Sequence, residues 1–171
     1  LKIDPIADKV TVTVTENSAA VTYDGTEHSV TGYKSMTADN TLYDVEKNVA
    51  EKPTKAWTAK GTDAGEYPVG IVSGDFKNTS VNFTNVEFVI VDGTLKIDPV
   101  SDKVTVTITE NADTVIYDTK EHSVKGYKSM TADNALYDVK KNVAETSTEA
   151  WTAKGTDVGE YPVGIKAGDF E

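Results

Sequence analysis

The stretch KVTVTVT at residues 9–15 alternates valine with threonine at a strict period of two. Val10, Val12 and Val14 therefore share one face of an extended chain and the threonines share the other, which is the pattern of a half-buried β-strand. Threonine and valine are frequent in the rest of the chain as well, with 24 and 22 copies in 171 residues. Because β-branched side chains favour extended backbone, this composition predicts an all-β fold.

The same stretch returns 94 residues later as KVTVTIT at 103–109, within a long internal repeat. Residues 95–171 match residues 1–77 at 58 of 77 positions, without a gap. An internal repeat of this length is the signature of tandem modules. We therefore predict a first β module over residues 1–98 and a second copy over residues 99–171.

The two ends of the repeat do not match each other. Residues 1–5, LKIDP, recur as residues 95–99, so they read as the tail strand of a preceding module. The second copy contains no counterpart of residues 78–94, and we expect it to be truncated and to lack its closing strand. An open sheet edge tends to pair with another chain. We therefore expect strand exchange between molecules, in which residues 1–4 of one chain fill part of the gap in another.

Each module shows six or seven short strand patterns, with turn signals at roughly ten-residue intervals. This spacing predicts immunoglobulin-like β-sandwich modules. Tyr67 follows Asp-Ala-Gly-Glu and resembles the tyrosine corner of immunoglobulin-like domains, and Tyr161 is its repeat. Trp57 and Trp151, a short distance upstream, are the expected core anchors.

Several segments of the first module bear on the topology. A β-grasp fold is the alternative to the sandwich, and it requires a genuine helix over residues 42–50, where helical and strand spacing both fit. Residues 35–40, SMTADN, read as a polar loop. Residues 86–91 are apolar at nearly every position, which predicts a strand buried on both faces. Asp92-Gly93 then reads either as a hairpin turn or as a bulge in one long strand.

Charge and composition argue against several classes of function. All 17 basic residues are lysine, and 28 acidic residues give a net charge of −11, which is unfavourable for binding nucleic acid. The absence of cysteine excludes disulfides, thiol catalysis and cysteine-based metal sites. No apolar run reaches the roughly 18 residues of a membrane span. No phosphate loop or nucleophile elbow is present, and we predict a non-catalytic protein without a cofactor.

Two groups of residues are candidates for binding a ligand. Hard oxygen ligands at close spacing can hold calcium, and such side chains cluster at Asp39, Asn40, Asp44, Asp133, Asn134 and Asp138. Exposed aromatic rings are common platforms for carbohydrate, and the candidates are Tyr33, Tyr43, Tyr127 and Tyr137. A solvated acidic loop is the alternative for the first group, and core packing is the alternative for the second.

The order of three segments carries a resemblance to a known group of proteins. VTYDGTEHSVTGY at 21–33, GTDAGEYPVGI at 61–71 and NFTNVEFVIVDGTLKIDP at 82–99 resemble the tandem modules of large cell-surface adhesin-like proteins of Firmicutes. They are more loosely similar to the MBG-type repeats of bacterial adhesins. The resemblance implies display outside the cell, attached to the wall or surface, in an adhesin or stalk role. It supplies no catalytic residues.

Three functions fit these observations. The first is a stalk or spacer that projects a distal binding domain of an adhesin. The second is an adhesive module that binds host glycan or matrix protein weakly in each copy and gains avidity from repetition. The third is an accessory domain of a secreted enzyme.

Overall fold

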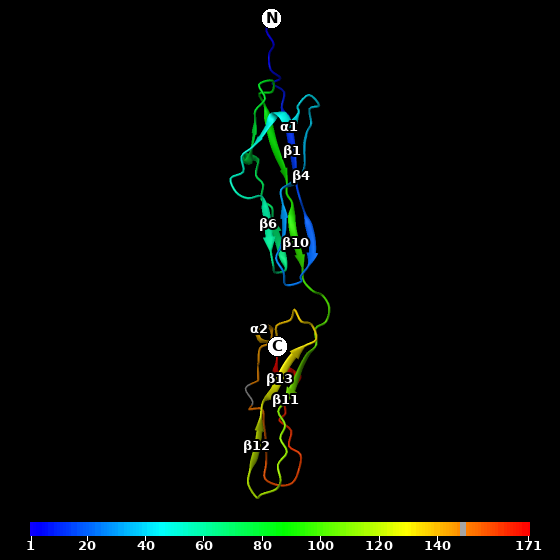
Figure 1. The fold of residues 1–171 in the computed structure, drawn as a ribbon, viewed down its shortest axis with the longest axis vertical. Coiled ribbons are helices and arrows are strands. Elements are labelled where there is room, and N and C mark those ends of the chain that lie inside the picture. Colours follow the sequence, from blue (N-terminus) through cyan, green and yellow to red (C-terminus); the bar gives the residue numbers. More distant parts are fainter. Residues whose placement is uncertain (148–149) are drawn as a thin grey trace. The chain divides into compact units, whose positions relative to one another are not determined.

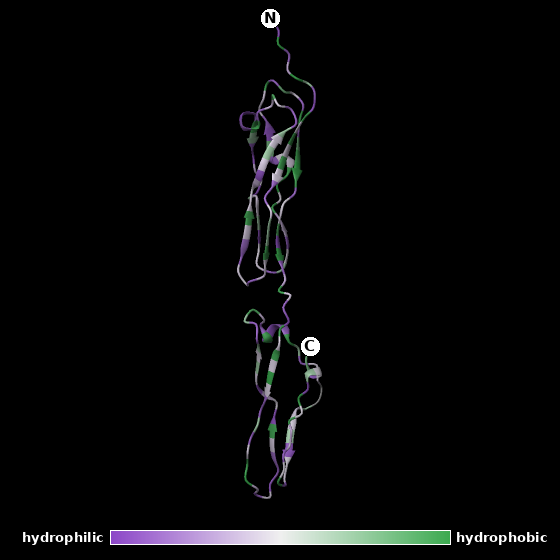
Figure 2. Cartoon of the chain, turned by 90° about the vertical axis from the view of Figure 1, so that its right-hand side faces the viewer, coloured by the Kyte–Doolittle hydropathy of each residue, from purple (hydrophilic) through white to green (hydrophobic). Residues whose placement is uncertain are grey.

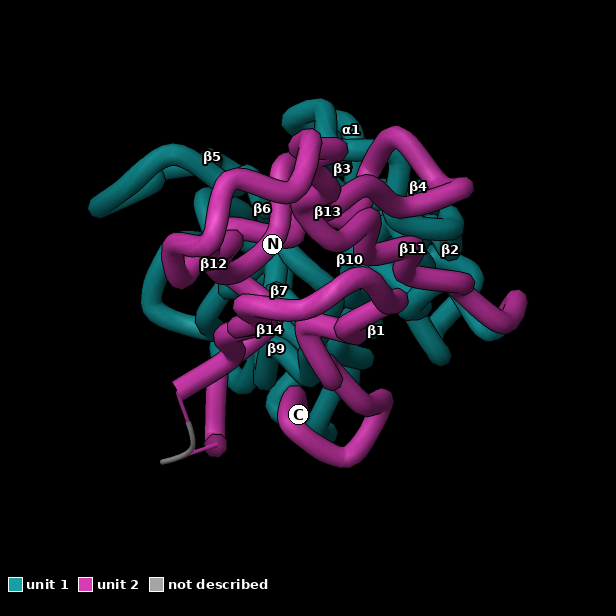
Figure 3. The backbone as a smooth tube through the Cα atoms, turned by 90° about the horizontal axis from the view of Figure 1, so that it is seen from below, with its two compact units in different colours: residues 1–101 teal, residues 102–171 magenta. Residues whose placement is uncertain are grey.

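The computed structural model describes residues 1–147 and 150–171, which divide into two compact units (Figure 3). Unit 1 comprises Leu1–Ser101 and unit 2 comprises Asp102–Glu171, so the division lies three residues after the predicted module boundary. The fold is all-β, as the composition predicts, and the described helices are single turns. None of them is long and apolar enough to cross a membrane.

Unit 1 contains ten strands and two helical turns. The strands are β1 (Val10–Glu16), β2 (Ala19–Thr22), β3 (His28–Thr31), β4 (Tyr33–Ala38), β5 (Val49–Glu51), β6 (Thr58–Gly61), β7 (Gly65–Pro68), β8 (Phe76–Asn78), β9 (Val86–Val91) and β10 (Thr94–Asp98). The turns are α1 (Val45–Asn48) and the 3-10 turn η1 (Ser73–Asp75).

The first two strands of unit 1 run side by side with its last two strands and in the same direction (Figure 1). β1 pairs in parallel with β9, and β2 pairs in parallel with β10. The pairing keeps a constant offset of 76 residues, from Val10 opposite Val86 to Ala19 opposite Leu95. The chain therefore runs straight on through Asp92-Gly93. The hairpin interpretation of that dipeptide is wrong. Because the offset is the same on both sides, no extra residue is inserted as in a bulge, and Asp92-Gly93 separates two strands that follow one another in line.

Antiparallel neighbours extend this parallel pair into sheets. β4 pairs with β1 to give the order β4-β1-β9, and β7 pairs with β10 to give β2-β10-β7. β3 pairs with β6, and β5 with β8. Gly32, with a φ of +69°, separates β3 from β4 in a conformation that glycine adopts readily. β4 extends to Ala38, so the predicted polar loop over 35–40 is confined to its last two residues.

The core of unit 1 lies between these sheets. Val10, Val12 and Val14 are fully buried, as their alternation predicts. The cluster around Val14 also contains Ala59, Val69, Ile71, Phe76, Leu95 and Ile97. A second cluster joins Val10 and Val12 to Tyr43 and Phe83. Hydrophobic residues accordingly recur along the strands (Figure 2).

One expectation about unit 1 requires correction, and the structure assigns one segment whose spacing fits both helix and strand. β9 is an edge strand whose residues alternate between half-buried and exposed, and Val89 and Val91 face solvent. The prediction of burial on both faces is therefore wrong. Residues 42–50 hold the four-residue turn α1 followed directly by β5, so they do not supply the helix that a β-grasp fold requires.

Unit 2 repeats part of this arrangement. Its elements are β11 (Val106–Glu110), β12 (His122–Lys125), β13 (Tyr127–Ala132), α2 (Val139–Asn142), β14 (Thr152–Gly155) and the 3-10 turn η2 (Ala167–Asp169). β11 pairs with β13 and β12 with β14, in the registers of β1 with β4 and β3 with β6. Residues 113–116 and 159–162 correspond to β2 and β7 but form no strand.

Candidate functional site

A buried carboxylate bridges the parallel-paired strands of unit 1. Glu16 ends β1 and lies on the same face as Val14, which leaves its side chain 2% exposed. Its carboxylate accepts the backbone N–H of Ile71 at 2.5 Å and that of Gly93 at 2.6 Å. Glu16 thus links β1 to the junction of β9 and β10 and to the segment that follows β7.

Gly93 is required at that junction by close packing. A Cβ atom on Gly93 would lie 2.1 Å from the carbonyl oxygen of Asn17, so no other residue fits without a shift of the backbone. Glu110 repeats Glu16 in unit 2 and accepts the N–H of Ile165 at 2.8 Å.

A second buried carboxylate organises the aromatic core. Asp75 is fully buried and accepts hydrogen bonds from Trp57 Nε1 at 2.8 Å, Val72 N at 3.1 Å, and both N and Oγ1 of Thr54 at 3.2 and 3.1 Å. Burial opposes ionisation of Asp75, but these donors outweigh it and hold the pKa below its ordinary value. Asp169 repeats part of the arrangement, accepting from Trp151 Nε1 at 3.0 Å.

The residues predicted to be structural make the contacts expected of them. Trp57 stacks on Phe76 with ring centroids 5.5 Å apart, and Trp151 stacks on Phe170 at 5.3 Å. Tyr67 donates its hydroxyl to the carbonyl oxygen of Asp63 at 2.9 Å, four residues upstream, which is the contact of a tyrosine corner. Tyr161 makes the same contact with Asp157 at 3.2 Å.

The candidate carbohydrate platforms are engaged in packing. Tyr43 is 4% exposed, and its ring lies 5.1 Å from that of Phe83. Tyr33 packs edge-on against Trp57, and its hydroxyl donates to Glu51 at 2.6 Å, which raises the pKa of Tyr33 to about 12. In unit 2 the Tyr127 hydroxyl donates to the Glu145 carboxylate, and the Tyr137 hydroxyl donates to the carbonyl oxygen of Asn142.

The candidate calcium ligands accept hydrogen bonds from backbone N–H groups. Asp39 accepts from Thr11 N, Asn40 from Leu42 N, and Asp44 from Glu46 N as the N-cap of α1. Their repeats do the same, with Asp133 accepting from Thr105 N, Asn134 from Leu136 N and Asp138 from Lys140 N. Among the described residues, no group of three or more His, Cys, Asp or Glu side chains is placed to hold a metal ion.

The turn before β3 brings an aspartate against a histidine, and its repeat in unit 2 has a different residue between the two. Asp24 accepts from the hydroxyl and the N–H of Thr26 and contacts Nε2 of His28 at 2.9 Å. The Thr26 hydroxyl makes the largest contribution to lowering the pKa of Asp24 from 3.8 to about 2. In unit 2 the pKa of Asp118 is also lowered, chiefly by His122, but Lys120 replaces the threonine.

Replacing Thr26 with alanine is expected to raise the pKa of Asp24 from about 2 towards 3.8. Because folding lowers this pKa, the ionised turn stabilises unit 1 fully above about pH 4, and that contribution is lost as the pH falls towards 2. A carboxyl-detected NMR titration measures the pKa. Asp118 is the internal control and should not change. An unchanged pKa of Asp24 in Thr26→Ala would contradict the assignment to the hydroxyl.

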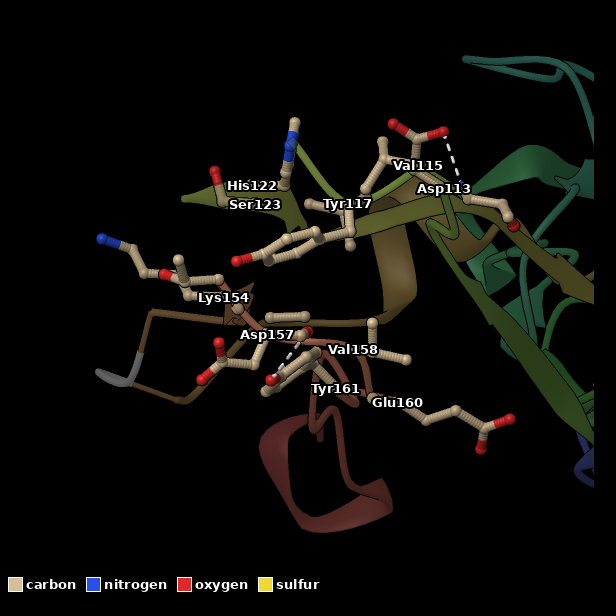
Figure 4. A pocket seen from close by; sticks show the side chains of 16 residues that line it. Asp113, Val115, Tyr117, His122, Ser123, Lys154, Asp157, Val158, Glu160 and Tyr161 are labelled. Atoms are coloured by element: carbon tan, nitrogen blue, oxygen red, sulfur yellow. Dashed lines mark hydrogen bonds between the residues drawn. The ribbon is translucent and has the colours of Figure 1, made fainter. Parts of the chain in front are cut away.

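The described residues also form a groove in unit 2, with a volume of about 460 Å³ (Figure 4). Val115 and Tyr117 border it on one side, and Val158 and Tyr161 on the other, while β12 and β14 contribute His122 and Lys154. In unit 1 the equivalent space is filled by β10, whose Leu95 and Ile97 are 1% and 2% exposed.

A scan against protein-family models, a search of curated proteins and a search of solved structures each found no match for this chain. The resemblance to surface modules of Firmicutes therefore stays a prediction. What the chain does has to be inferred from its strand pairing and its buried contacts.

Proposed function

We propose that this chain is a non-catalytic repeat region of a bacterial cell-surface protein and acts as a stalk or spacer in an adhesin. The observation that supports this role is the parallel pairing of β1 with β9 and of β2 with β10 in unit 1. Because β1–β2 and β9–β10 run in the same direction, the chain enters unit 1 at one end and leaves it at the other (Figure 1). A strand rises about 3.3 Å per residue, so the 13 residues from Val10 to Thr22 advance the chain by about 43 Å.

The same pairing suits a module that is pulled from its two ends. A force applied to the entering and leaving strands acts along the β1–β9 and β2–β10 ladders. Their hydrogen bonds then share the force and do not open one at a time. Glu16 crosses the ladder near its middle, where the two strands are interrupted, and adds two charge-assisted hydrogen bonds. Such a module transmits tension while staying folded.

Side-chain placement also favours the spacer over the adhesive role. A carbohydrate platform needs exposed rings, but Tyr43 is buried and Tyr33 is engaged with Trp57 and Glu51. The net charge of −11 supplies mutual repulsion between neighbouring copies, which suits a protein displayed at high density outside the cell. Binding of a bead-displayed form to an array of glycans and matrix proteins would favour the adhesive role instead.

Single-molecule pulling tests the role directly, because the absence of cysteine lets engineered thiols define the points of attachment. Attachment at Asp8→Cys and Ser101→Cys pulls β1 and β10 along their ladders. Attachment at Asp63→Cys and Ser101→Cys is the control, since it peels β7 from its antiparallel partner β10 from one end. We expect unit 1 to unfold at a severalfold higher force in the first geometry. Equal forces in the two geometries would count against the spacer.

A further inference from the structure

The strand β9 has one edge that no other strand occupies. In the order β4-β1-β9 it pairs with β1 on one side, and no strand of residues 1–147 and 150–171 pairs with its other side. The turn η1 lies near β9, and Phe76, which follows that turn, stacks on Phe88 within the core. The sequence VEFVIV of β9 contains no proline and a single charge, that of Glu87. An apolar edge of this kind is a template for pairing with another chain.

The opposite edge of the same sheet is protected, whereas that of β9 is not. β4 carries the exposed Lys34 and lies against α1, and charges and covering elements are the usual protection of an edge strand. On β9 the outward side chains are Glu87, whose charge is paired with that of Lys9, and two valines. Val89 and Val91 are 39% and 46% exposed.

Alternate residues of β9 turn their backbone groups to the open edge. Val10 donates its N–H to the carbonyl oxygen of Asn85 at 2.9 Å, where the β1–β9 ladder begins. In a regular ladder every second residue of a strand bonds to the same neighbour, so the odd-numbered residues of 85–91 face β1. The N–H and carbonyl groups of Phe88 and Ile90 therefore face the open edge and are free to bond to an added strand.

We propose that the open edge of β9 pairs in antiparallel orientation with β9 of a second copy, with the two Val89 residues opposite each other. In this register Phe88 of each copy lies opposite Ile90 of the other. Opposed residues of an antiparallel pair exchange both of their hydrogen bonds when their backbone groups face each other, so all the free groups of Phe88 and Ile90 are satisfied. The contact is isologous and closes at a dimer. The pairing does not depend on the proposed spacer role.

Charge and side-chain pairing point to a second copy as the occupant. Glu87 falls opposite Val91 of the other copy, so the two carboxylates lie at opposite ends of the paired strands, and each keeps its ion pair with Lys9. The central pairs are apolar, with valine beside valine on the outer face and phenylalanine beside isoleucine on the core face. Apolar cross-strand pairs stabilise a sheet and directly opposed like charges destabilise it, so β9 is complementary to itself.

Sedimentation velocity over a range of protein and salt concentrations tests the pairing. We expect a monomer–dimer equilibrium that shifts towards the dimer as salt screens the net charge of −11. Val89→Lys and Val89→Glu each place like charges opposite each other and should stay monomeric, whereas an equimolar mixture should pair because lysine then faces glutamate. Val81→Lys, at a site that is 85% exposed, is the control and should pair like the parent chain.

Rescue in the mixture also shows that both charged variants are folded. A monomeric parent chain at every salt concentration, or species larger than a dimer, would overturn the proposal. A mixture that associates no more than its two components would overturn the register.

Disulfide trapping locates the contact, because the chain contains no cysteine of its own. Val89→Cys should form covalent dimers under mild oxidation severalfold faster than Val81→Cys, although Val81 is the more exposed of the two. Glu87→Cys and Val91→Cys should each dimerise slowly alone and form a mixed dimer when combined. Equal rates for Val89→Cys and Val81→Cys, or no mixed dimer, would contradict the predicted pairing.

The antiparallel orientation makes unit 1 of one copy point opposite to unit 1 of the other. Copies that meet from two facing surfaces can form this contact, a use that rests on the proposed display of the chain outside the cell. Beads carrying Val89→Lys and beads carrying Val89→Glu, each attached through the N-terminus, should cluster only when the two kinds are mixed. Dimers in solution without clustering of the mixed beads would overturn this use and leave the pairing itself in place.

Discussion

Replacing Glu16 with alanine is expected to lower the free energy of unfolding of unit 1 by about 3–5 kcal/mol. The carboxylate is buried and accepts the N–H groups of Ile71 and Gly93. Alanine leaves both donors buried without an acceptor, and each unsatisfied group costs roughly 1–3 kcal/mol. The loss of the packed side chain adds to this cost. This one replacement removes the side-chain hydrogen bonds that join the end of β1 to the β9–β10 junction and to the segment after β7.

The measurement is urea denaturation followed by ¹⁹F NMR of chain labelled with fluorotryptophan. The two tryptophans are Trp57 in unit 1 and Trp151 in unit 2, so each unit has its own signal, assigned with a Trp151→Phe variant. Glu110→Ala is the matched control. Among the described residues Glu110 accepts one hydrogen bond, from the N–H of Ile165, and its loss should cost unit 2 about 1–3 kcal/mol. A change of less than about 1 kcal/mol for Glu16→Ala would show that water reaches the two donors.

The strands could be predicted from the sequence because strand formation depends on the local pattern of residues. The face shared by Val10, Val12 and Val14 follows from a period of two, and burial of that face follows from its composition. The pairing of β1 with β9 joins residues that are 76 positions apart, and no local pattern encodes it. Asp92-Gly93 shows the conflict, since its local preference for a hairpin turn is overridden by a ladder that continues on both sides of it.

The residues that organise the core were harder to predict than the strands. Glu16 has a signal in the sequence: it continues the apolar face of Val12 and Val14, where a charge has to be buried and paired. Asp75 has no such signal, because its donors come from segments 18 to 21 residues away and from its own turn. Tyr43 is a sequence candidate for an exposed ring, yet its ring packs beside Phe83, forty residues further along the chain.

Unit 2 is expected to unfold at a much lower urea concentration than unit 1, although 58 of 77 positions are shared. In unit 1 the β9–β10 segment supplies Leu95 and Ile97, which are fully buried, and Phe88 and Ile90, which are partly buried. Each such side chain contributes roughly 1.5–3 kcal/mol when buried, so the segment supplies about 5–10 kcal/mol. That is as large as the whole stability of a small domain. In the described part of unit 2, Ala153 and Val163 are the only buried hydrophobic residues, and they are 5% and 7% exposed.

The two ¹⁹F signals test this difference, because the Trp151 signal should reach its unfolded position first and the Trp57 signal well after it. A peptide with the sequence of residues 86–99 should raise the midpoint of the Trp151 transition and leave the Trp57 transition unchanged. A peptide carrying aspartate in place of the leucine and isoleucine of β10 is the control and should do neither. If the two transitions coincide without peptide, β9 and β10 contribute little to the free energy of unfolding of unit 1. Separate transitions with no response to peptide would place the weakness of unit 2 elsewhere, in residues 113–116 or in its own aromatic cluster.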